Sequence, residues 1–523
     1  MAPVAWGWAG RLVETAGPHR RNPVTPRQRA RDWSGDRPLL HLVFPRWQPL
    51  GLHRVWGHRM PPMALLVLAA VARRSGWRVR LVDRNVKGHA TESGDERPDL
   101  AAITVWTPLA GDAYRIADAY RRRGVPVVLG GVHPSLLPTE ALRHADAVVS
   151  GEAESVLPTV LADAAAGRLG RLYQGTWGSM DDTPTVHEWA DLLRAWPISR
   201  YVPLNTLQTT RGCRFNCDFC SVIRINGQAS RHRDPDVVVD ELRVLKRVGQ
   251  RVGDFTYVFF LDDDLAADRA YMGELCEAIL RSGVRVTWGT QGSLVVARDE
   301  ELLDLAARSG MRALFTGFES VSPGSLREAK KQRNRPGEYG ELVTRLHRRG
   351  IGVEGGFIFG FDHDPPTVFT ETAELADRIG VDAAHFSLLT PYPGTHTFAR
   401  FLAEDRITSF DWSCYDLYHA VITPARMSRE QLEQGLWTAY RVFYSGRRSV
   451  RRLARELPRR APSLTLFAGL TLADYARHYR RSTPPPPARA HPTAPEDVAR
   501  LAAVSAAPAR ETLTLAYRDA TEP

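Results

Sequence analysis

The sequence lacks the features that mark disulfide scaffolds, secreted proteins and membrane-spanning proteins. It holds five cysteines among 523 residues, an odd number with three of them clustered, which argues against a framework of paired disulfides and for a reducing cytosol. No apolar run reaches the roughly 18 residues that a membrane-spanning helix needs. The N-terminus shows no apolar core followed by a small-residue cleavage site. We therefore expect a cytoplasmic protein.

Lysine is also scarce, and arginine carries most of the positive charge. The net charge is +10, which is compatible with binding to nucleic acid or to an anionic membrane. Arginine-rich coding in a GC-rich genome explains the same excess without any partner. Because the sequence contains no nucleic-acid-binding motif, we predict no nucleic-acid partner. With 43% hydrophobic and 24% charged residues, the composition is that of an ordinary globular protein.

Three of the five cysteines stand together. The stretch Arg211-Gly-Cys-Arg-Phe-Asn-Cys-Asp-Phe-Cys220 places Cys213, Cys217 and Cys220 within eight residues. Soft thiolates this close select zinc or an iron–sulfur cluster. A structural zinc site needs four protein ligands, and no further cysteine or histidine follows at finger-like spacing. A cubane cluster held by three cysteines instead leaves one iron open to a small molecule.

The spacing Cys-x3-Cys-x2-Cys, with Phe219 before the last cysteine, resembles the signature of the radical S-adenosylmethionine (SAM) superfamily. The resemblance implies that Cys213, Cys217 and Cys220 ligate a [4Fe-4S] cluster. It further implies that SAM chelates the open iron, with Phe219 beside it. An electron donor such as a flavodoxin or a ferredoxin is implied as a partner.

Upstream of the cysteines, short apolar runs alternate with stretches of helical periodicity. This alternation predicts an α/β domain with a doubly wound parallel sheet over residues 38–170. We expect a disordered basic arm before it, at 1–37, and a connector after it, at 171–200. Such sheets bind ligands at the carboxyl ends of their strands. The predicted strands are Leu39–Phe44, Val79–Asp83, Leu100–Val105, Val127–Leu129 and Ala147–Ser150.

This N-terminal unit resembles the Rossmann-like cobalamin-binding domain that is fused to many radical SAM enzymes. The resemblance rests on Pro61-Pro62, on Gly130-Gly-Val-His-Pro-Ser135 and on Gly151-Glu-Ala-Glu154, and it implies bound cobalamin. Asn85 stands where one form of the domain has a cobalt-ligating histidine, so either cobalt has no histidine ligand there or the domain binds no cobalamin. For His133, packing or hydrogen bonding within its loop is the alternative. The candidate cobalamin contacts are Trp106, Thr107, Gly130, Gly131, His133 and Glu152.

Residues 201–400 contain six further strand candidates separated by helical stretches. Six β/α units predict a partial (β/α)6 barrel, with its site at the carboxyl ends of the strands. The predicted strands are Leu204–Thr210, Tyr257–Leu261, Val284–Trp288, Arg312–Thr316, Gly352–Phe359 and Ala384–Leu389.

Polar residues follow several of these strands. By the same resemblance, one or more of Asp262, Asp263 and Asp264 contacts the amino group of SAM. A helix N-cap with an acidic turn is the alternative, whereas the pattern of a calcium loop is missing. Gln291 and Ser293 would face SAM or substrate. The motif Gly317-Phe-Glu-Ser320 resembles the one that hydrogen-bonds the SAM ribose, and Glu319 is its leading candidate because a carboxylate accepts bidentate bonds from a diol.

Residues 401–482 predict a helical C-terminal extension. It resembles the extension of cobalamin-linked radical SAM proteins that include hopanoid-lipid methylases. Tyr415, Tyr418 and His419 either reach over the barrel mouth, where Tyr415 and His419 are catalytic candidates, or form a packed aromatic layer. Cys414 is a further catalytic candidate; otherwise it is a structural thiol, like Cys276.

The end of the chain carries two more patterns. Arginines crowd residues 447–460, and an apolar stretch follows at 464–472. This segment either lies on an anionic membrane surface, as a peripheral contact, or packs as a helix on the barrel. Residues 483–523 contain a run of four prolines from Pro484 and predict a disordered Pro/Ala-rich tail.

Together the resemblances imply an enzyme with a [4Fe-4S] cluster, SAM and cobalamin. It would cleave SAM to a 5′-deoxyadenosyl radical and methylate an unactivated carbon of a hopanoid-like lipid or a secondary metabolite. Two alternatives stay open. One is a radical SAM cyclase, rearrangement or oxidation enzyme without methyl transfer, and the other is a non-catalytic protein that binds a metal cluster.

Overall fold

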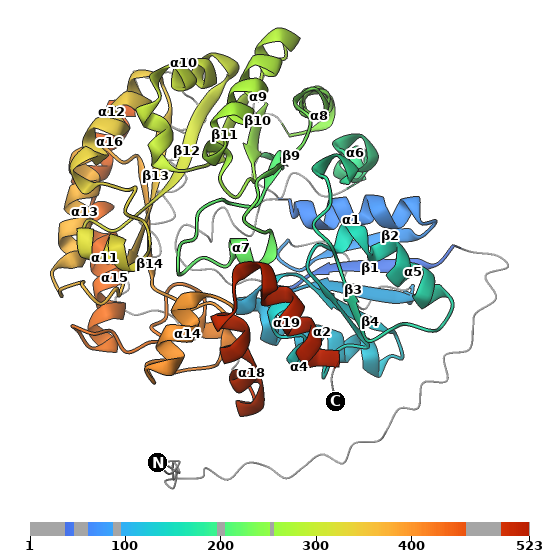
Figure 1. The fold of residues 1–523 in the computed structure, drawn as a ribbon. Helices are drawn as coiled ribbons and strands as arrows, with labels where there is room; N and C mark the ends of the chain where they lie inside the picture. The colour runs from blue at the N-terminus through green and yellow to red at the C-terminus, as the bar shows by residue number, and fades with distance from the viewer. Residues whose placement is uncertain are drawn as a thin grey trace, which may run out of the picture.

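The computed structural model describes residues 37–46, 61–86, 96–195, 204–250, 256–456 and 493–521. Within these residues the chain forms two six-stranded parallel sheets and a two-stranded hairpin. Figure 1 shows the first large sheet in blue to cyan and the second in green to orange. The apolar segment at 464–472 and nearly all of the expected basic arm lie outside the described residues.

The first sheet and its helices follow the predicted alternation. The elements are β1 (Leu39–Phe44), α1 (Met63–Arg74), β2 (Arg78–Asp83), β3 (Leu100–Thr104), α2 (Ala110–Arg122), β4 (Val127–Gly130), α3 (Val132–Leu136), α4 (Pro138–Ala141), β5 (Ala147–Ser150), α5 (Leu157–Ala165), β6 (Leu172–Gln174) and α6 (Val186–Ala195). The strand order is β2-β1-β3-β4-β5-β6. Leu40 and Leu42 pack on one face with α1 and α5, whereas Val43 and Ile103 share a core with α2.

The predicted doubly wound parallel sheet is therefore confirmed. The segment at 171–200 differs from a plain connector. Its residues 172–174 form β6, which pairs with β5 and extends the sheet, and α6 packs against α1. Three residues are too short a run for hydrophobic periodicity to reveal a strand.

The second sheet has the order β14-β13-β12-β11-β10-β7 and remains open. Its strands are β7 (Asn205–Leu207), β10 (Tyr257–Phe260), β11 (Thr287–Gln291), β12 (Met311–Glu319), β13 (Gly352–Phe359) and β14 (Ala383–Leu388). Its helices are α8 (Pro235–Val248), α9 (Arg269–Ser282), α10 (Glu300–Ser309), α11 (Pro323–Glu328), α12 (Tyr339–Arg348), α13 (Val368–Ile379) and α14 (His396–Ala403). The parallel strands and intervening helices match the predicted partial barrel.

The strand β11 begins three residues later than the sequence indicates. The alternation of Val284 and Val286 suggested a strand at that point, but the ladder begins where Thr287 pairs with Tyr257 of β10. Register with the neighbouring strand decides where hydrogen bonding begins, and local β propensity does not fix that register.

The helical extension covers the open edge of the second sheet. It contains α15 (Arg429–Phe443) and α16 (Gly446–Glu456). The Tyr440 hydroxyl accepts from the Phe386 amide and donates to the Phe386 carbonyl, at 3.1 and 2.7 Å. The Tyr444 hydroxyl does the same for Ala384, at 2.9 Å in both bonds. Two tyrosines one helical turn apart thus satisfy backbone groups of an edge strand that would otherwise be open to another chain.

The last described residues form two helices, α18 (Pro495–Ala506) and α19 (Ala509–Thr521). They appear in red beside α7 (Val222–Ile225) and α14 in Figure 1. The prediction of a disordered tail is wrong for residues 493–521, because Leu501, Val504, Leu513 and Ala516 are buried. These apolar residues recur at helical spacing, although the neighbouring proline run is typical of disorder. No helix in the described ranges is long and apolar enough to cross a membrane.

Candidate functional site

A short hairpin frames the clustered cysteines. Strands β8 (Thr210–Arg211) and β9 (Arg231–His232) pair antiparallel, and the three cysteines and α7 lie in the loop between them. Gly212 has a φ of 92°, and a Cβ there would lie 2.2 Å from the Ala229 carbonyl oxygen. Only glycine fits at the position before the first cysteine.

The three thiols lie near one another. Burial raises the pKa of Cys213 to about 11, and Asp264 and Cys217 add to the shift. Burial and then Cys217 raise the pKa of Cys220 to about 12. Metal binding offsets this cost because it stabilises the thiolate, so the donor set fits an iron–sulfur cluster. In the part of the chain that the structure describes, no group of three His, Cys, Asp or Glu side chains has the arrangement needed to bind a single metal ion.

The first two aspartates after β10 hold the hairpin. Asp262 is fully buried and accepts hydrogen bonds from the amides of Thr209 and Thr210, at 2.7 and 2.9 Å. Burial raises its pKa to about 6. Asp263 accepts from the Gly212 amide at 2.8 Å. These carboxylates fix the strand end that leads into the cysteine loop.

The third aspartate holds the loop after β11. Asp264 accepts from the amide of Ser293 at 2.8 Å and from its hydroxyl. Gln291, the last residue of β11, is partly exposed. Phe219 is partly buried against the core. All of these predicted SAM-site residues lie at the carboxyl ends of the strands or in the loops that follow them.

Glu319, another predicted SAM-site residue, is the last residue of β12. Its φ of 64° is in the left-handed region, and its carboxylate pairs with the ammonium of Lys331. A Cβ on Gly317 would lie 2.0 Å from the Glu319 carboxylate, so the glycine leaves room for the pair. The charge of Glu319 and then of Cys217 outweighs burial and raises the pKa of Lys331.

Lys331 and Arg333 are functional candidates that the sequence analysis did not identify. The Arg333 guanidinium lies 3.6 Å from the sulfur of Cys217 and 3.5 Å from the ring centre of Phe215. Lys330 pairs with Asp218 at 2.8 Å. The chain contains only four lysines, and two of them are adjacent here. Two adjacent lysines in so arginine-rich a sequence were the signal that could have pointed to this segment.

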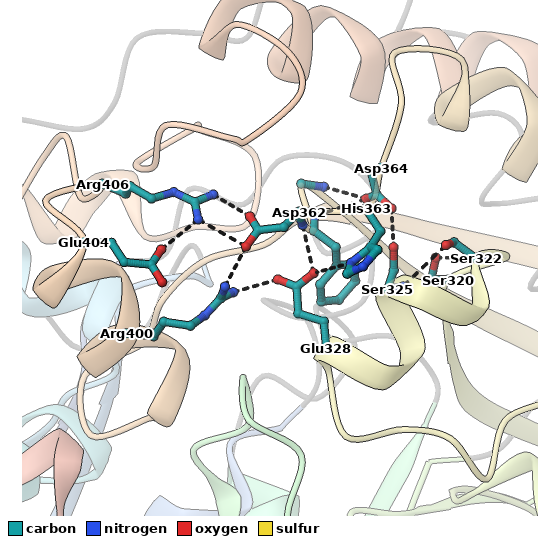
Figure 2. Close-up of polar contacts among 12 residues, drawn as sticks. Ser320, Ser322, Ser325, Glu328, Asp362, His363, Asp364, Arg400, Glu404 and Arg406 are labelled. Atoms are coloured by element: carbon teal, nitrogen blue, oxygen red, sulfur yellow. Dashed lines mark hydrogen bonds and ion pairs between the residues drawn. The ribbon is translucent and has the colours of Figure 1, made fainter.

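The loop after β13 is held by a network of ion pairs, which Figure 2 shows. Arg400 and Arg406 both bind Asp362, at 2.6 Å, and Arg400 also binds Glu328 at 2.6 Å. Arg406 pairs with Glu404 at 2.8 Å. We call these five residues the wall network. It fixes the loop that directly follows β13.

The predicted cobalamin-contact loops come together at the carboxyl edge of the first sheet. Trp106 is 40% exposed, whereas Thr107 is buried at the start of a 3-10 turn. Gly130 ends β4, and Gly131 has a φ of 102°. A Cβ on Gly131 would lie 2.9 Å from the Val105 carbonyl oxygen. The glycine lets the two neighbouring loops pack against each other.

The side chain of His133 points into the protein. It is fully buried, and its Nε2 lies 3.2 Å from Glu140. Burial opposes ionisation of Glu140, but hydrogen bonds from His133, Trp412 and Tyr114 lower its pKa to about 2. The His133 ring therefore has no exposed atom with which to make the predicted contact to cobalamin. Its ring instead contributes to a buried link between the first domain and the extension.

Asn85 and Glu152 are also engaged within the protein. The Asn85 amide donates to the Pro45 carbonyl and to Asp83, at 2.9 Å in both bonds. Both carboxylate oxygens of Glu152 face arginines of the cysteine hairpin. Glu152 thus joins the two domains.

The aromatic residues of the extension form a packed layer. Tyr415 is fully buried, and its hydroxyl donates to the Ser409 carbonyl at 2.9 Å. Tyr418 hydrogen-bonds His385 at 3.2 Å. His419 is partly exposed and bonds Asp416 at 2.9 Å. Burial raises the pKa of Cys414 to about 11, so its reactive thiolate form is disfavoured.

Two family models match this chain in sequence. The B12 binding domain matches residues 51–161, and the Radical SAM superfamily matches residues 207–376. In fold, the chain is similar to the cobalamin-dependent SAM radical enzyme OxsB, with a TM-score of 0.61 and 14% identity over 92% of this chain and 80% of that one.

Three curated relatives align over most of the chain. The bacteriochlorophyllide d C-12(1)-methyltransferase of Chlorobaculum tepidum is 33% identical, over 75% of this chain and 84% of the relative. The hopanoid C-3 methylase of Methylococcus capsulatus is 28% identical, over 74% and 77%. The anaerobic magnesium-protoporphyrin IX monomethyl ester cyclase of Rubrivivax gelatinosus is 27% identical, over 73% and 74%.

Proposed function

This chain belongs to the cobalamin-dependent radical SAM methyltransferase family, and on that premise we propose that it methylates an unactivated carbon of a small organic molecule. The observation that carries the proposal is the 33% identity to a methyltransferase across both domains. The cofactors of the family are a [4Fe-4S] cluster, SAM and cobalamin.

The cluster would be held by Cys213, Cys217 and Cys220, and cobalamin by the loops at the carboxyl edge of the first sheet. When bound, these groups supply an electron, a 5′-deoxyadenosyl radical derived from SAM and a transferable methyl group. A small electron carrier such as a flavodoxin or ferredoxin is our proposed donor. The net charge of +10 would speed encounter with an acidic carrier.

The chain's own residues would preorganise the SAM site. Asp262, Asp263 and Asp264 hold two segments, the start of the cysteine hairpin and the loop after β11, by backbone amides, so little reordering is needed when a ligand enters. Glu319 is our candidate for the SAM ribose. The Lys331 ammonium pairs with that carboxylate, whose residue has a left-handed backbone conformation.

The methylating relatives guide the substrate proposal. A bacteriochlorophyllide and a hopanoid are the substrates named for two methylating relatives. We propose a carbon of a hopanoid-like lipid, of a tetrapyrrole or of another secondary metabolite as the methyl acceptor. Binding at a membrane surface is a further proposal for a lipid substrate.

The decisive experiment uses protein that has been reconstituted anaerobically with iron, sulfide and hydroxocobalamin. With SAM, a reductant and candidate acceptors, we expect 5′-deoxyadenosine, S-adenosylhomocysteine and methylated product. Formation of 5′-deoxyadenosine and an altered acceptor, without S-adenosylhomocysteine or methylation, would instead favour the reaction class of the cyclase relative.

A lysine pair offers an internal test of the SAM site. Replacing Lys331→Met removes the counter-charge of Glu319, and we expect the SAM dissociation constant to rise about tenfold or more, as loss of a buried charge partner predicts. Lys330→Met, at the neighbouring but half-exposed lysine, is the matched control and should leave SAM affinity nearly unchanged. Equal effects in the two variants would argue against this role.

A further inference from the structure

Four charged side chains meet where the two domains touch. Glu152 and Glu154 follow β5 of the first sheet, and Arg211 and Arg231 belong to the cysteine hairpin. The Arg211 guanidinium lies 2.5 Å from Glu154 and 3.3 Å from Glu152. Arg231 donates to both carboxylate oxygens of Glu152, at 3.0 Å for one of them. We call these four residues the junction cluster.

The hairpin by itself brings two like charges together. Arg211 and Arg231 are direct cross-strand partners, an arrangement that is destabilising when both side chains carry the same charge. Their side chains are only 10% and 17% exposed, so water screens the repulsion poorly. Glu152 and Glu154, which balance these charges, come from the other domain. The hairpin geometry therefore depends on the first domain.

The junction cluster touches the loops of both cofactor sites. On the barrel side, Arg211 directly precedes Gly212, and Arg231 donates to the Asn226 carbonyl at 3.1 Å. The Asn226 side chain in turn donates to Asp263 at 2.9 Å. These contacts hold the base of the cysteine loop.

On the other side, the same carboxylates extend from the predicted cobalamin edge. The Gly151 amide donates to the Ser135 hydroxyl at 2.9 Å, so the loop after β5 is bonded to α3, the helix that follows β4. Arg231 also donates to the Gly178 carbonyl at 2.9 Å, which ties the hairpin to the segment after β6. A shift in either cofactor loop must move a buried charge away from its partner.

We propose that the junction cluster couples the two cofactor sites, so that assembly of the iron–sulfur cluster in the hairpin tightens cobalamin binding and cobalamin stabilises the loaded hairpin. Arg211, Arg231, Glu152 and Glu154 are positioning residues, since they act through the loops and not on reacting atoms. Such coupling is reciprocal by thermodynamic linkage. It concerns the cofactors of the family and does not depend on which acceptor is methylated.

The test measures cobalamin affinity in the full chain with and without the reconstituted cluster, by anaerobic titration with hydroxocobalamin. For the wild type we expect cobalamin to bind roughly 5–150-fold more tightly when the cluster is present. In Arg231→Gln and in Glu152→Gln this ratio should fall to within about twofold of unity, because one link between the loops is lost. Iron content and the spectrum of the reduced cluster verify loading in each sample.

Arg406→Gln is the matched control, since it removes an arginine from the wall network of the same barrel and should keep the wild-type ratio. Glu154→Gln removes a single charge with little change of shape. If Arg231→Gln or Glu152→Gln does not fold, the ratio of cobalamin affinities is measured in Glu154→Gln instead. A wild-type ratio near unity would overturn the proposal, as would a wild-type ratio retained in the folded junction variants. The ratio is a binding measurement, so a failed methylation assay does not affect it.

Discussion

The junction cluster and the wall network are built from the same residue types but serve different parts of the molecule. In the wall network all five side chains come from the barrel and its flanking segments, and their exposure ranges from 11% for Glu328 to 42% for Glu404. In the junction cluster the arginines and the carboxylates belong to different domains, and exposure ranges from 10% to 19%.

This difference sets what each network can do. The wall network pairs all of its charges without any residue of the first domain, so it stiffens a loop wherever that domain lies. Neither half of the junction cluster is neutral without the other half, and a buried charge without its partner is strongly unfavourable. The same chemistry therefore supports a loop in one place and enforces a domain arrangement in the other.

The largest effect should come from removing a cysteine of the hairpin. We expect Cys217→Ala to lose almost all bound iron, because a cubane with only two protein thiolates is poorly held. Cys276→Ala changes a thiol buried in α9 and should retain iron. Iron and sulfide analysis after anaerobic reconstitution distinguishes the two. Equal iron in both variants would mean that the hairpin is not the cluster site.

The next effect should be on the stability of the junction. Arg231→Gln leaves Glu152 with only the longer contact to Arg211, and we expect a loss of about 3–5 kcal/mol in unfolding free energy, as for other broken buried pairs. Urea unfolding at neutral pH measures it. A loss below about 1 kcal/mol, the value for an exposed pair, would show that the junction behaves like a surface network.

Acidification should change the stability contributions of Asp364, beside the wall network, and of Glu154, in the junction cluster, in opposite directions. Burial raises the pKa of Asp364, which lies in the loop of the wall network, from 3.8 to about 6. Its contribution to stability is full below pH 3.8 and is lost as the pH rises through about 6. Relative to Asp364→Asn, the wild type should lose roughly 3 kcal/mol between pH 3 and 7.

For Glu154, burial favours the neutral form, but the charge of Arg211 outweighs burial and lowers the pKa below 4.5. Its contribution is present above pH 4.5 and is lost as the pH falls through the folded-state pKa. The advantage of the wild type over Glu154→Gln should therefore shrink on acidification. Urea unfolding of both pairs at several pH values checks the two signs, and the same sign in both would refute the contrast.

The smallest effect should come from Arg406→Gln in the wall network. Asp362 keeps Arg400 as a partner at 2.6 Å, so we expect a loss of only about 1 kcal/mol and unchanged iron content. Thermal unfolding and iron analysis test both parts. A loss as large as that of Arg231→Gln would remove the distinction between the two networks.

The sequence anticipated elements whose signal is local. The cysteine spacing, the strand–helix alternation and the glycines at 130–131 each follow from a few neighbouring residues. It failed where the signal was short or depended on register, as for β6 at 172–174 and the start of β11 at Thr287. It also misjudged residues 493–521, because composition outweighed the spacing of the apolar positions that α18 and α19 bury.

The sequence by itself determined the two-domain α/β architecture and the thiols that suit an iron–sulfur cluster, since periodicity and ligand spacing are properties of the chain. Only the tertiary structure decided which charges meet. Glu152 and Arg231 are separated by 79 positions, and His133 lies against Trp412 of the extension. Pairing of this kind depends on how the domains pack, so no local pattern encodes it. For that reason Glu152 was expected at a cofactor, whereas its carboxylate holds the hairpin of the clustered cysteines.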